Sequence, residues 1–154
     1  MKSSHNYLRN KKATFAILLL TTIFYYGCSV NLIATYDQTA VNDIIQAYQL
    51  VDSFYQKLSA TPEEQRDYKS FSTDYENIES CLRVLVLKNS ARTLNKESTE
   101  IAKNILGLWQ KYKNNHQESN NYDSELIEIH RNRFFENFEA MAIAENSKPR
   151  IKEQ

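Results

Sequence analysis

Apolar side chains recur at steps of three and four residues along most of the chain after its first quarter, which is the spacing of one face of an α-helix. Four such stripes run over about residues 38–59, 62–87, 95–112 and 123–145. No internal repeat of about 20–50 residues is present, which argues against a solenoid. The pattern predicts an all-α fold, an up-down helical bundle of about four helices over residues 38–145.

The first and last stripes define faces that we expect to be buried. The first consists of Val41, Ile44, Ile45, Tyr48, Val51, Phe54, Tyr55 and Leu58. The last consists of Leu126, Ile129, Phe134, Phe135, Phe138, Met141 and Ala142. Between them, the apolar run at residues 82–87 covers nearly all sides of the second helix, so we expect this end to be enclosed. Residues 146–154 are polar and are expected to form a frayed tail.

Helix starts are indicated by capping residues. Asp37 precedes the first stripe and is a good N-cap candidate. The segment Thr61-Pro62-Glu63-Glu64 places a capping hydroxyl before a proline, with a glutamate three residues after the cap. This arrangement predicts the start of the second helix. We expect the last helix to begin near Asp123.

The break between the second and third helices is harder to place. The polar stretch between about Lys88 and Asn95 tolerates a turn, yet the three-four spacing continues through it. A single helix over residues 62–112 would be about 75 Å long, so a turn is favoured. The polar run over residues 113–121, which contains His116, is expected to end the third helix.

The first 28 residues have a different pattern. Four basic residues precede an uncharged apolar stretch over residues 13–24, and Gly27 and Cys28 follow. A basic tip, a short apolar segment and a small residue are the layout of an export signal. The cysteine directly after it resembles the lipid-attachment site of bacterial lipoproteins. The resemblance implies a signal peptide over residues 1–27, cleavage between Gly27 and Cys28, lipid on the Cys28 thiol and a short tether over residues 28–37.

Two features keep other membrane arrangements open. Lipoprotein signals usually place Leu or a similar aliphatic residue three positions before the cysteine, where this chain has Tyr25. Uncharged residues also continue beyond the cysteine, so residues 13–36 are long enough to span a bilayer uncleaved, with the basic tip in the cytoplasm. A cleaved secretory signal without lipid is a third alternative. Both membrane-bound arrangements place the bundle on the outer side of the inner membrane. Ser29, where many inner-membrane lipoproteins carry Asp, favours the outer membrane.

Composition adds two constraints. Removal of residues 1–27 leaves 15 basic and 19 acidic residues, a net charge of −4, which favours solubility and argues against a nucleic-acid-binding face. The remaining chain holds one glycine, Gly107, and two prolines, which favours long helices over strands joined by tight turns. With Cys28 acylated, Cys81 is the only thiol left, so no intrachain disulfide forms, and we expect Cys81 to be buried among apolar side chains.

The sequence shows no pattern of residues that indicates catalysis, a metal site or a cofactor. His116 and His130 lack the glutamate three residues earlier that di-metal bundles use, and we expect His130 on a solvated or partly buried flank. Glu136 and Glu139 are one turn apart, but we expect a solvated helix face rather than an acid–base pair. The single glycine excludes a Gly-rich phosphate loop, and no serine has an identifiable base. We therefore expect a protein that is not an enzyme.

A wider resemblance covers nearly the whole chain after the signal. The features that carry it are Gly27-Cys28, Leu32, Tyr36-Asp37, Phe54, Leu58, Phe135, Phe138, Glu145 and Lys148. With these features the chain resembles a group of small, mostly uncharacterised bacterial envelope lipoproteins. The resemblance implies a helical bundle without an established catalytic residue.

These observations predict a non-catalytic lipoprotein on the periplasmic side of the bacterial cell envelope. It is expected to act as an interaction or structural module, bound to the membrane through its lipid and to an envelope protein or a second copy of itself. The alternatives are a bundle that binds a small apolar ligand or a metal, and an uncleaved single-span protein. An interaction module should have a filled core and an apolar patch outside, whereas a ligand carrier needs an internal cavity.

Tyrosines are numerous for a small bundle, and most of them are expected to pack at the edge of the core, where hydroxyls reach water. A binding surface is the alternative, because Tyr is enriched at contact hot spots. The tyrosines concerned are Tyr48, Tyr55, Tyr68, Tyr75, Tyr112 and Tyr122.

Overall fold

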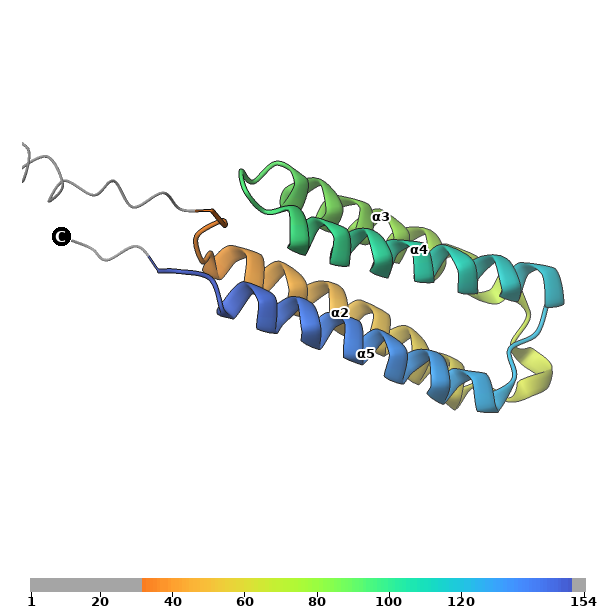
Figure 1. Cartoon of the computed structure of the whole chain (residues 1–154). Coiled ribbons are helices and arrows are strands. Elements are labelled where there is room, and N and C mark those ends of the chain that lie inside the picture. Colours follow the sequence, from red (N-terminus) through yellow and green to blue (C-terminus); the bar gives the residue numbers. More distant parts are fainter. Residues whose placement is uncertain (1–31, 151–154) are drawn as a thin grey trace, which may run out of the picture. The chain divides into compact units, whose positions relative to one another are not determined.

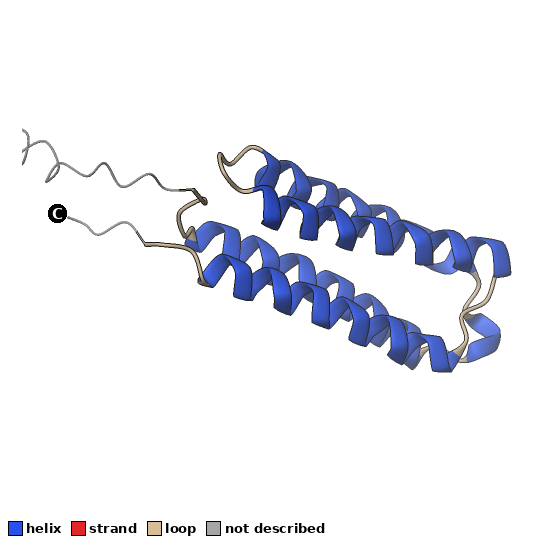
Figure 2. Cartoon of the chain, viewed as in Figure 1, coloured by secondary structure: helices blue, strands red, loops and turns tan. Residues whose placement is uncertain are grey.

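The computed structural model describes residues 32–150, and within this range the secondary structure is entirely helical (Figures 1 and 2). The elements are α2 (Gln38–Ala60), the short 3₁₀ helix η1 (Glu63–Gln65), α3 (Tyr68–Ser90), α4 (Lys96–Ser119) and α5 (Ser124–Asn146). The prediction of an all-α bundle of four long helices is confirmed.

The four long helices form two pairs. Helix α2 lies along α5 and α3 lies along α4, and the pairs are joined through α2–α3 and α4–α5 contacts (Figure 1). The segments before α2 and after α5 meet at one end of the bundle, which also carries the α3–α4 turn. We call this the entry end. The opposite end, which carries η1 and the α4–α5 turn, is called the far end.

The core is filled largely by aromatic side chains. Trp109 of α4 is fully buried, and its indole nitrogen donates to the main-chain oxygen of Tyr75 at 3.2 Å. Its ring centroid lies 5.0 Å from that of Phe54 and 5.9 Å from that of Phe134, both edge to face, which is a favourable arrangement of aromatic rings. The Tyr75 ring of α3 also lies 5.2 Å from the Trp109 ring. Because these rings come from all four helices, one cluster holds both pairs together.

The predicted start of the second helix is wrong by several residues. The Thr61 hydroxyl donates to the main-chain oxygen of Lys57 at 2.8 Å and therefore closes the end of α2 instead of opening the next helix. Pro62 leads only into η1, and α3 begins at Tyr68 behind its N-cap Asp67. The N-caps at Asp37 and Asp123 are present, and each carboxylate accepts from a main-chain amide at 2.8 Å.

The expected turn between the second and third helices is confirmed. Leu94 adopts the left-handed conformation with φ of 60°, and the Asn95 side chain donates to the main-chain oxygen of Asn89 at 3.0 Å. The expected end of the third helix is wrong, because α4 continues through most of the polar run to Ser119. His116 points from this extension into the core and is 1% exposed.

Several expected burials are also corrected by the structure. The apolar run at the end of α3 is not enclosed, since Leu87 is 65% exposed and Val84 is also exposed. Ile45, Leu126, Ile129 and Phe135 are exposed although they were placed in buried stripes. Cys81 is half-buried and packs at the margin of the core.

Within residues 32–150, no helix has both the length and the apolar character required to cross a bilayer. The predicted signal peptide and most of the alternative span over residues 13–36 lie outside the described residues.

Candidate functional site

The residues predicted to attach the chain to the membrane, Gly27 and Cys28, lie outside the described residues. Cleavage and lipid attachment therefore remain predictions from the sequence. Within the bundle, three kinds of feature could carry a function, namely exposed apolar surface, pockets and buried polar groups.

Helix α5 is apolar on its core side and also on both flanks. Its core side is formed by buried residues such as Phe134 and Met141. On the flanks, Ile129, Phe135 and Ile143 are 51%, 47% and 60% exposed. A helix with apolar residues on most of its circumference is normally covered on most sides. Within residues 32–150 the main helix contacts of α5 are with α2 and α4, and part of its apolar surface stays in contact with solvent.

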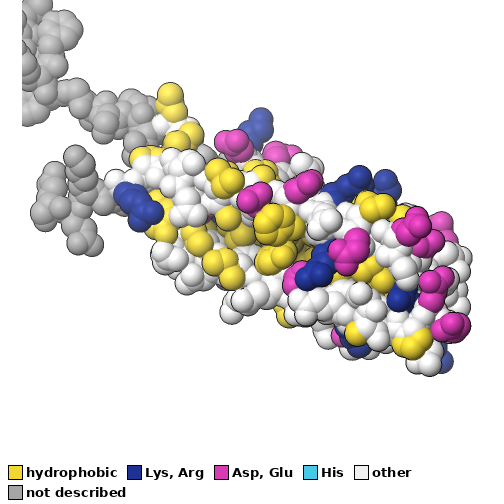
Figure 3. Space-filling view, turned by 90° about the horizontal axis from the view of Figure 1, so that it is seen from below, with side chains coloured by type: hydrophobic (Ala, Val, Ile, Leu, Met, Phe, Trp, Pro, Cys, Tyr) yellow, Lys and Arg dark blue, Asp and Glu magenta, His cyan; other side chains and the backbone are white. Residues whose placement is uncertain are grey.

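An open groove runs between α2 and α5 on the outer face of that pair, and Figure 3 shows hydrophobic side chains gathered on this face between charged ones. It has a volume of about 200 Å³. The α2/α5 groove is lined by Ile44, Ile45, Tyr48, Phe135, Phe138, Glu139 and Ala142. The Tyr48 ring lies edge to face against Phe135 and Phe138, with centroid distances of 6.0 and 5.7 Å. Aromatic contacts therefore join the two helices along the groove, and its rim of Ile45 and Phe135 is half-exposed.

Charged groups stand near the two ends of the α2/α5 groove. Toward the far end, Arg131 of α5 donates through Nε to Oδ1 of Asp52 in α2 at 2.7 Å. This hydrogen bond is the main reason that the pKa of Asp52 lies below its ordinary value. Toward the entry end stands Glu139, which is exposed and makes no ion pair with any residue between 32 and 150.

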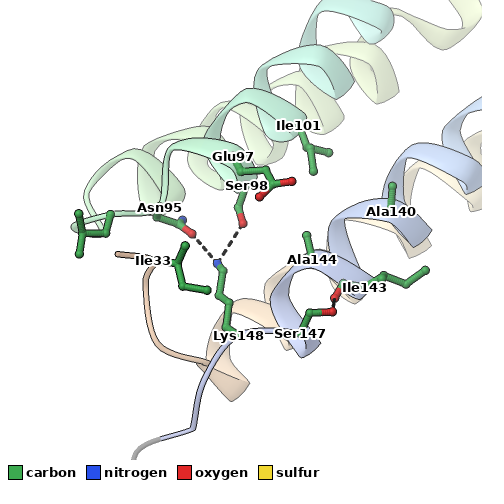
Figure 4. A pocket seen from close by; sticks show the side chains of 11 residues that line it. Ile33, Asn95, Glu97, Ser98, Ile101, Ala140, Ile143, Ala144, Ser147 and Lys148 are labelled. Carbon is green, nitrogen blue, oxygen red and sulfur yellow. Dashed lines mark hydrogen bonds between the residues drawn. The ribbon is translucent and has the colours of Figure 1, made fainter. Parts of the chain in front are cut away.

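A second, larger pocket of about 530 Å³ opens between α4 and α5 at the entry end (Figure 4). Its walls are mainly apolar and include Ile101 of α4 and Ile143 of α5. Lys148 reaches into it, and its ammonium group donates to Ser98 Oγ at 2.9 Å and to the Asn95 side chain. The Lys148 ammonium group is therefore already paired with polar groups of the pocket wall.

Behind this pocket lies a buried ion cluster around Glu145, whose side chain is fully buried. Both terminal nitrogens of Arg92 donate to its carboxylate at 2.9 Å, and Lys148 donates to it at 2.5 Å. The main-chain amide of Asp37 adds a further bond at 3.1 Å. Burial alone would raise the pKa of Glu145, but the bonds from Arg92 and Lys148 outweigh it, so the pKa lies below its ordinary value. The cluster ties α5 to the α3–α4 turn and to the start of α2.

The tail is not frayed at its start, contrary to the prediction. Lys148 is held by the ion cluster, and the main-chain oxygen of Pro149 accepts from the Tyr36 amide at 3.0 Å. The Arg150 guanidinium lies 3.9 Å from the centre of the Tyr36 ring, a cation–π contact. The described part of the tail, residues 147–150, therefore packs on the segment that enters α2.

The far end contains two buried histidines that hydrogen-bond to tyrosines. His116 Nε2 lies 2.7 Å from the main-chain oxygen of Arg66, and Nδ1 lies 3.0 Å from the Tyr75 hydroxyl. Because a carbonyl oxygen only accepts, Nε2 carries the proton and Nδ1 accepts from Tyr75. Burial lowers the pKa of His116, so the ring is neutral at pH 7.

His130 is also buried, which corrects the expected position on a solvated or partly buried flank. Its Nδ1 lies 2.6 Å from the Tyr122 hydroxyl, and its ring stacks on Tyr112 with centroids 3.5 Å apart. Burial is the main cause that lowers the pKa of His130 to about 4, with Arg133 and Lys111 contributing. Burial raises the pKa values of Tyr55, Tyr75 and Tyr122, so these three hydroxyls stay protonated.

These buried groups connect elements that are distant in sequence through hydrogen bonds and ion pairs. Their partners include other side chains, main-chain oxygens and the Asp37 amide. Glu136 and Glu139 are exposed on α5. Among residues 32–150, no three His, Cys, Asp or Glu side chains come together in a way that would hold a metal ion. The tyrosines are mainly structural, since four of the six are buried.

Comparisons of the chain with models of protein families, with curated proteins and with solved structures give no match. The resemblance to envelope lipoproteins thus remains a prediction from the sequence.

The exposed flanks of α5 are a candidate contact surface that the helical spacing did not reveal. Phe135 and Ile129 were assigned to one buried stripe with Phe134 and Phe138. The sequence does contain evidence for this exposure, because the six-residue spacing places Ile129 and Phe135 about 120° apart around a helix with 3.6 residues per turn. No single neighbouring helix can cover both directions.

Proposed function

We propose that this protein is a membrane-tethered, non-catalytic interaction module of the bacterial cell envelope. The proposed tether is lipid on Cys28 after cleavage of residues 1–27, and the bundle is then held on the periplasmic side, at the outer membrane. The described bundle supplies the surface through which the protein contacts another polypeptide.

The observation that carries this proposal is the combination of a filled core with a partly uncovered α5. The largest core side chains, including Trp109 and Tyr55, are almost completely excluded from solvent, so the aromatic cluster leaves no space for a ligand among them. Phe135 and Ile143 instead expose about half or more of their surface on two sides of the same helix. Exposed apolar patches of this kind mark contact surfaces for other proteins or membranes.

The tether is tested by growth of cells with radiolabelled palmitate. We expect the wild-type chain and the Cys81→Ala variant to incorporate label, and the Cys28→Ala variant to incorporate none. Cys81→Ala is the matched control because it removes the only other thiol. Equal labelling of Cys28→Ala and the wild type would exclude lipid attachment at this residue.

The interaction surface is tested with the photo-crosslinking amino acid p-benzoylphenylalanine in intact cells. It is placed in the full chain at Ile129, Phe135 or Ile143 on α5, and at exposed Thr73 on α3 as the control. We expect discrete adducts of higher mass from positions on α5 and none from position 73. An absence of adducts from all three α5 positions in membrane-bound protein would contradict the interaction module.

A further inference from the structure

Along one flank of α5, beside the α2/α5 groove, a basic, an aromatic and an acidic side chain follow one another at equal spacing. Arg131, Phe135 and Glu139 are separated by four residues each, so they form one row with steps of about 6 Å along the helix. Phe135 at its centre is 47% exposed. The row therefore has a positive end, an apolar centre and a negative end.

Both charged ends of this row retain capacity for a further partner. Arg131 uses only Nε for Asp52, and its two terminal nitrogens make no hydrogen bond to any residue between 32 and 150. Its side chain is 34% exposed. Glu139 is exposed and has no basic partner within the same residues. A guanidinium with unused donors and a carboxylate with unused acceptors are matched groups for a bidentate pair.

The spacing of the row makes it complementary to a copy of itself in one orientation. When two α5 helices meet antiparallel about a twofold axis at Phe135, Arg131 of each copy faces Glu139 of the other. The two Phe135 rings then meet at the axis, and Ile45 and Tyr48 extend the apolar contact on α2. A parallel pair in the same register would place Arg131 against Arg131, and such like-charge contacts are unfavourable.

We propose that the occupant of the α2/α5 groove is a second copy of this chain, docked antiparallel through a twofold contact centred on Phe135. This inference rests on the proposed function and names its partner. A twofold contact uses the same patch on both copies, which is what a row with opposite charges at equal distances from its centre provides. Two copies on one membrane meet in this way when their helices lie parallel to the membrane plane.

The test uses the full chain in intact cells, with p-benzoylphenylalanine at position 135 so that an aromatic ring is kept. We expect an adduct of twice the chain mass that contains this chain alone. The variant Glu139→Arg should lower the yield of that adduct about tenfold, because Arg131 then faces a second guanidinium in both contacts. Arg131→Glu should do the same, and the double variant Arg131→Glu with Glu139→Arg should restore it.

Two controls separate this proposal from the function on which it rests. Glu139→Arg changes an exposed residue without an ion pair to the described chain, so helical circular dichroism should be unchanged and loss of the adduct reports contact instead of folding. An adduct of position 135 with a different polypeptide would overturn the second-copy proposal and leave the interaction module standing. A self-adduct that is insensitive to both charge reversals would overturn the antiparallel contact.

Discussion

Replacement of Glu145 by glutamine is expected to lower the free energy of unfolding by about 3 kcal/mol, since loss of one partner leaves buried charges uncompensated. The substitution keeps the shape of the side chain and removes only its charge. Arg92 and Lys148 are 20% and 9% exposed at their side chains, so water replaces the lost carboxylate poorly. Denaturant unfolding of the full chain in non-ionic detergent, followed by circular dichroism, measures the change.

The matched control for this variant is Glu100→Gln. Glu100 pairs with Lys103 across one turn of α4, and both side chains are more than half exposed, so its loss should leave the unfolding midpoint unchanged within error. Amide hydrogen exchange adds a local readout, because Ala34 and Tyr36 donate main-chain hydrogen bonds at the entry end. Faster exchange at these two amides should accompany Glu145→Gln. Equal stability of the two variants would show that the ion cluster does not hold the entry end.

Acidification from pH 7 to pH 5 is expected to lower the free energy of unfolding by about 2 kcal/mol through His130 alone. The pKa of this histidine is about 4 in the folded chain, against an ordinary value of 6.5. The unfolded chain therefore binds a proton below pH 6.5 that the folded chain does not bind until about pH 4. The free energy of unfolding therefore falls as the pH is lowered from about 6.5 to about 4. Below about pH 4, His130 is protonated in both states and causes no further loss. His116 acts in the same direction, since its pKa is also lowered.

Denaturant unfolding at several pH values between 7 and 5 tests this expectation in the wild type and in His130→Phe. The phenylalanine keeps a ring stacked on Tyr112 and cannot titrate, so the variant should show a shallower decline. Carboxylates with lowered pKa values also stabilise the folded chain. Glu79, with a pKa of about 2, loses this stabilisation mainly below its ordinary pKa of 4.5, so it changes the free energy of unfolding little between pH 7 and pH 5. The same slope in both proteins would contradict the burial of His130 as a neutral ring.

Much of the bundle could be predicted because helical spacing is a local property. The stripes after Asp37 and Asp123 identify α2 and α5 to within one or two residues. The Thr61-Pro62 start failed because a threonine hydroxyl can serve either end of a helix, and here it closes the end of α2. Whether such a hydroxyl caps the start or the end of a helix depends on the conformation of the residues that follow, which the local sequence pattern does not determine.

The polar groups inside the bundle could not be predicted, because their partners are distant in sequence. Glu145 is paired in the interior with Arg92, which lies 53 residues away, and His116 with Tyr75 and Arg66, which lie 41 and 50 residues away. In the sequence, these polar residues cannot be told apart from residues of solvated helix faces and turns. The exposed flanks of α5 were missed for a related reason. Helical spacing identifies the apolar positions of a helix, but it does not show how many neighbouring helices pack against them.

The hydrogen bond between the Tyr36 amide and the Pro149 oxygen makes the bundle nearly a closed ring. Helix α5 is connected to α2 in space almost as directly as α2 is connected to α3 along the chain. The order in which the helices are synthesised is then not essential to the architecture, as in other domains whose ends lie close together. Both ends of the described chain, at residues 32 and 150, therefore lie at the entry end, so a segment fused to either end would start from the same end of the bundle.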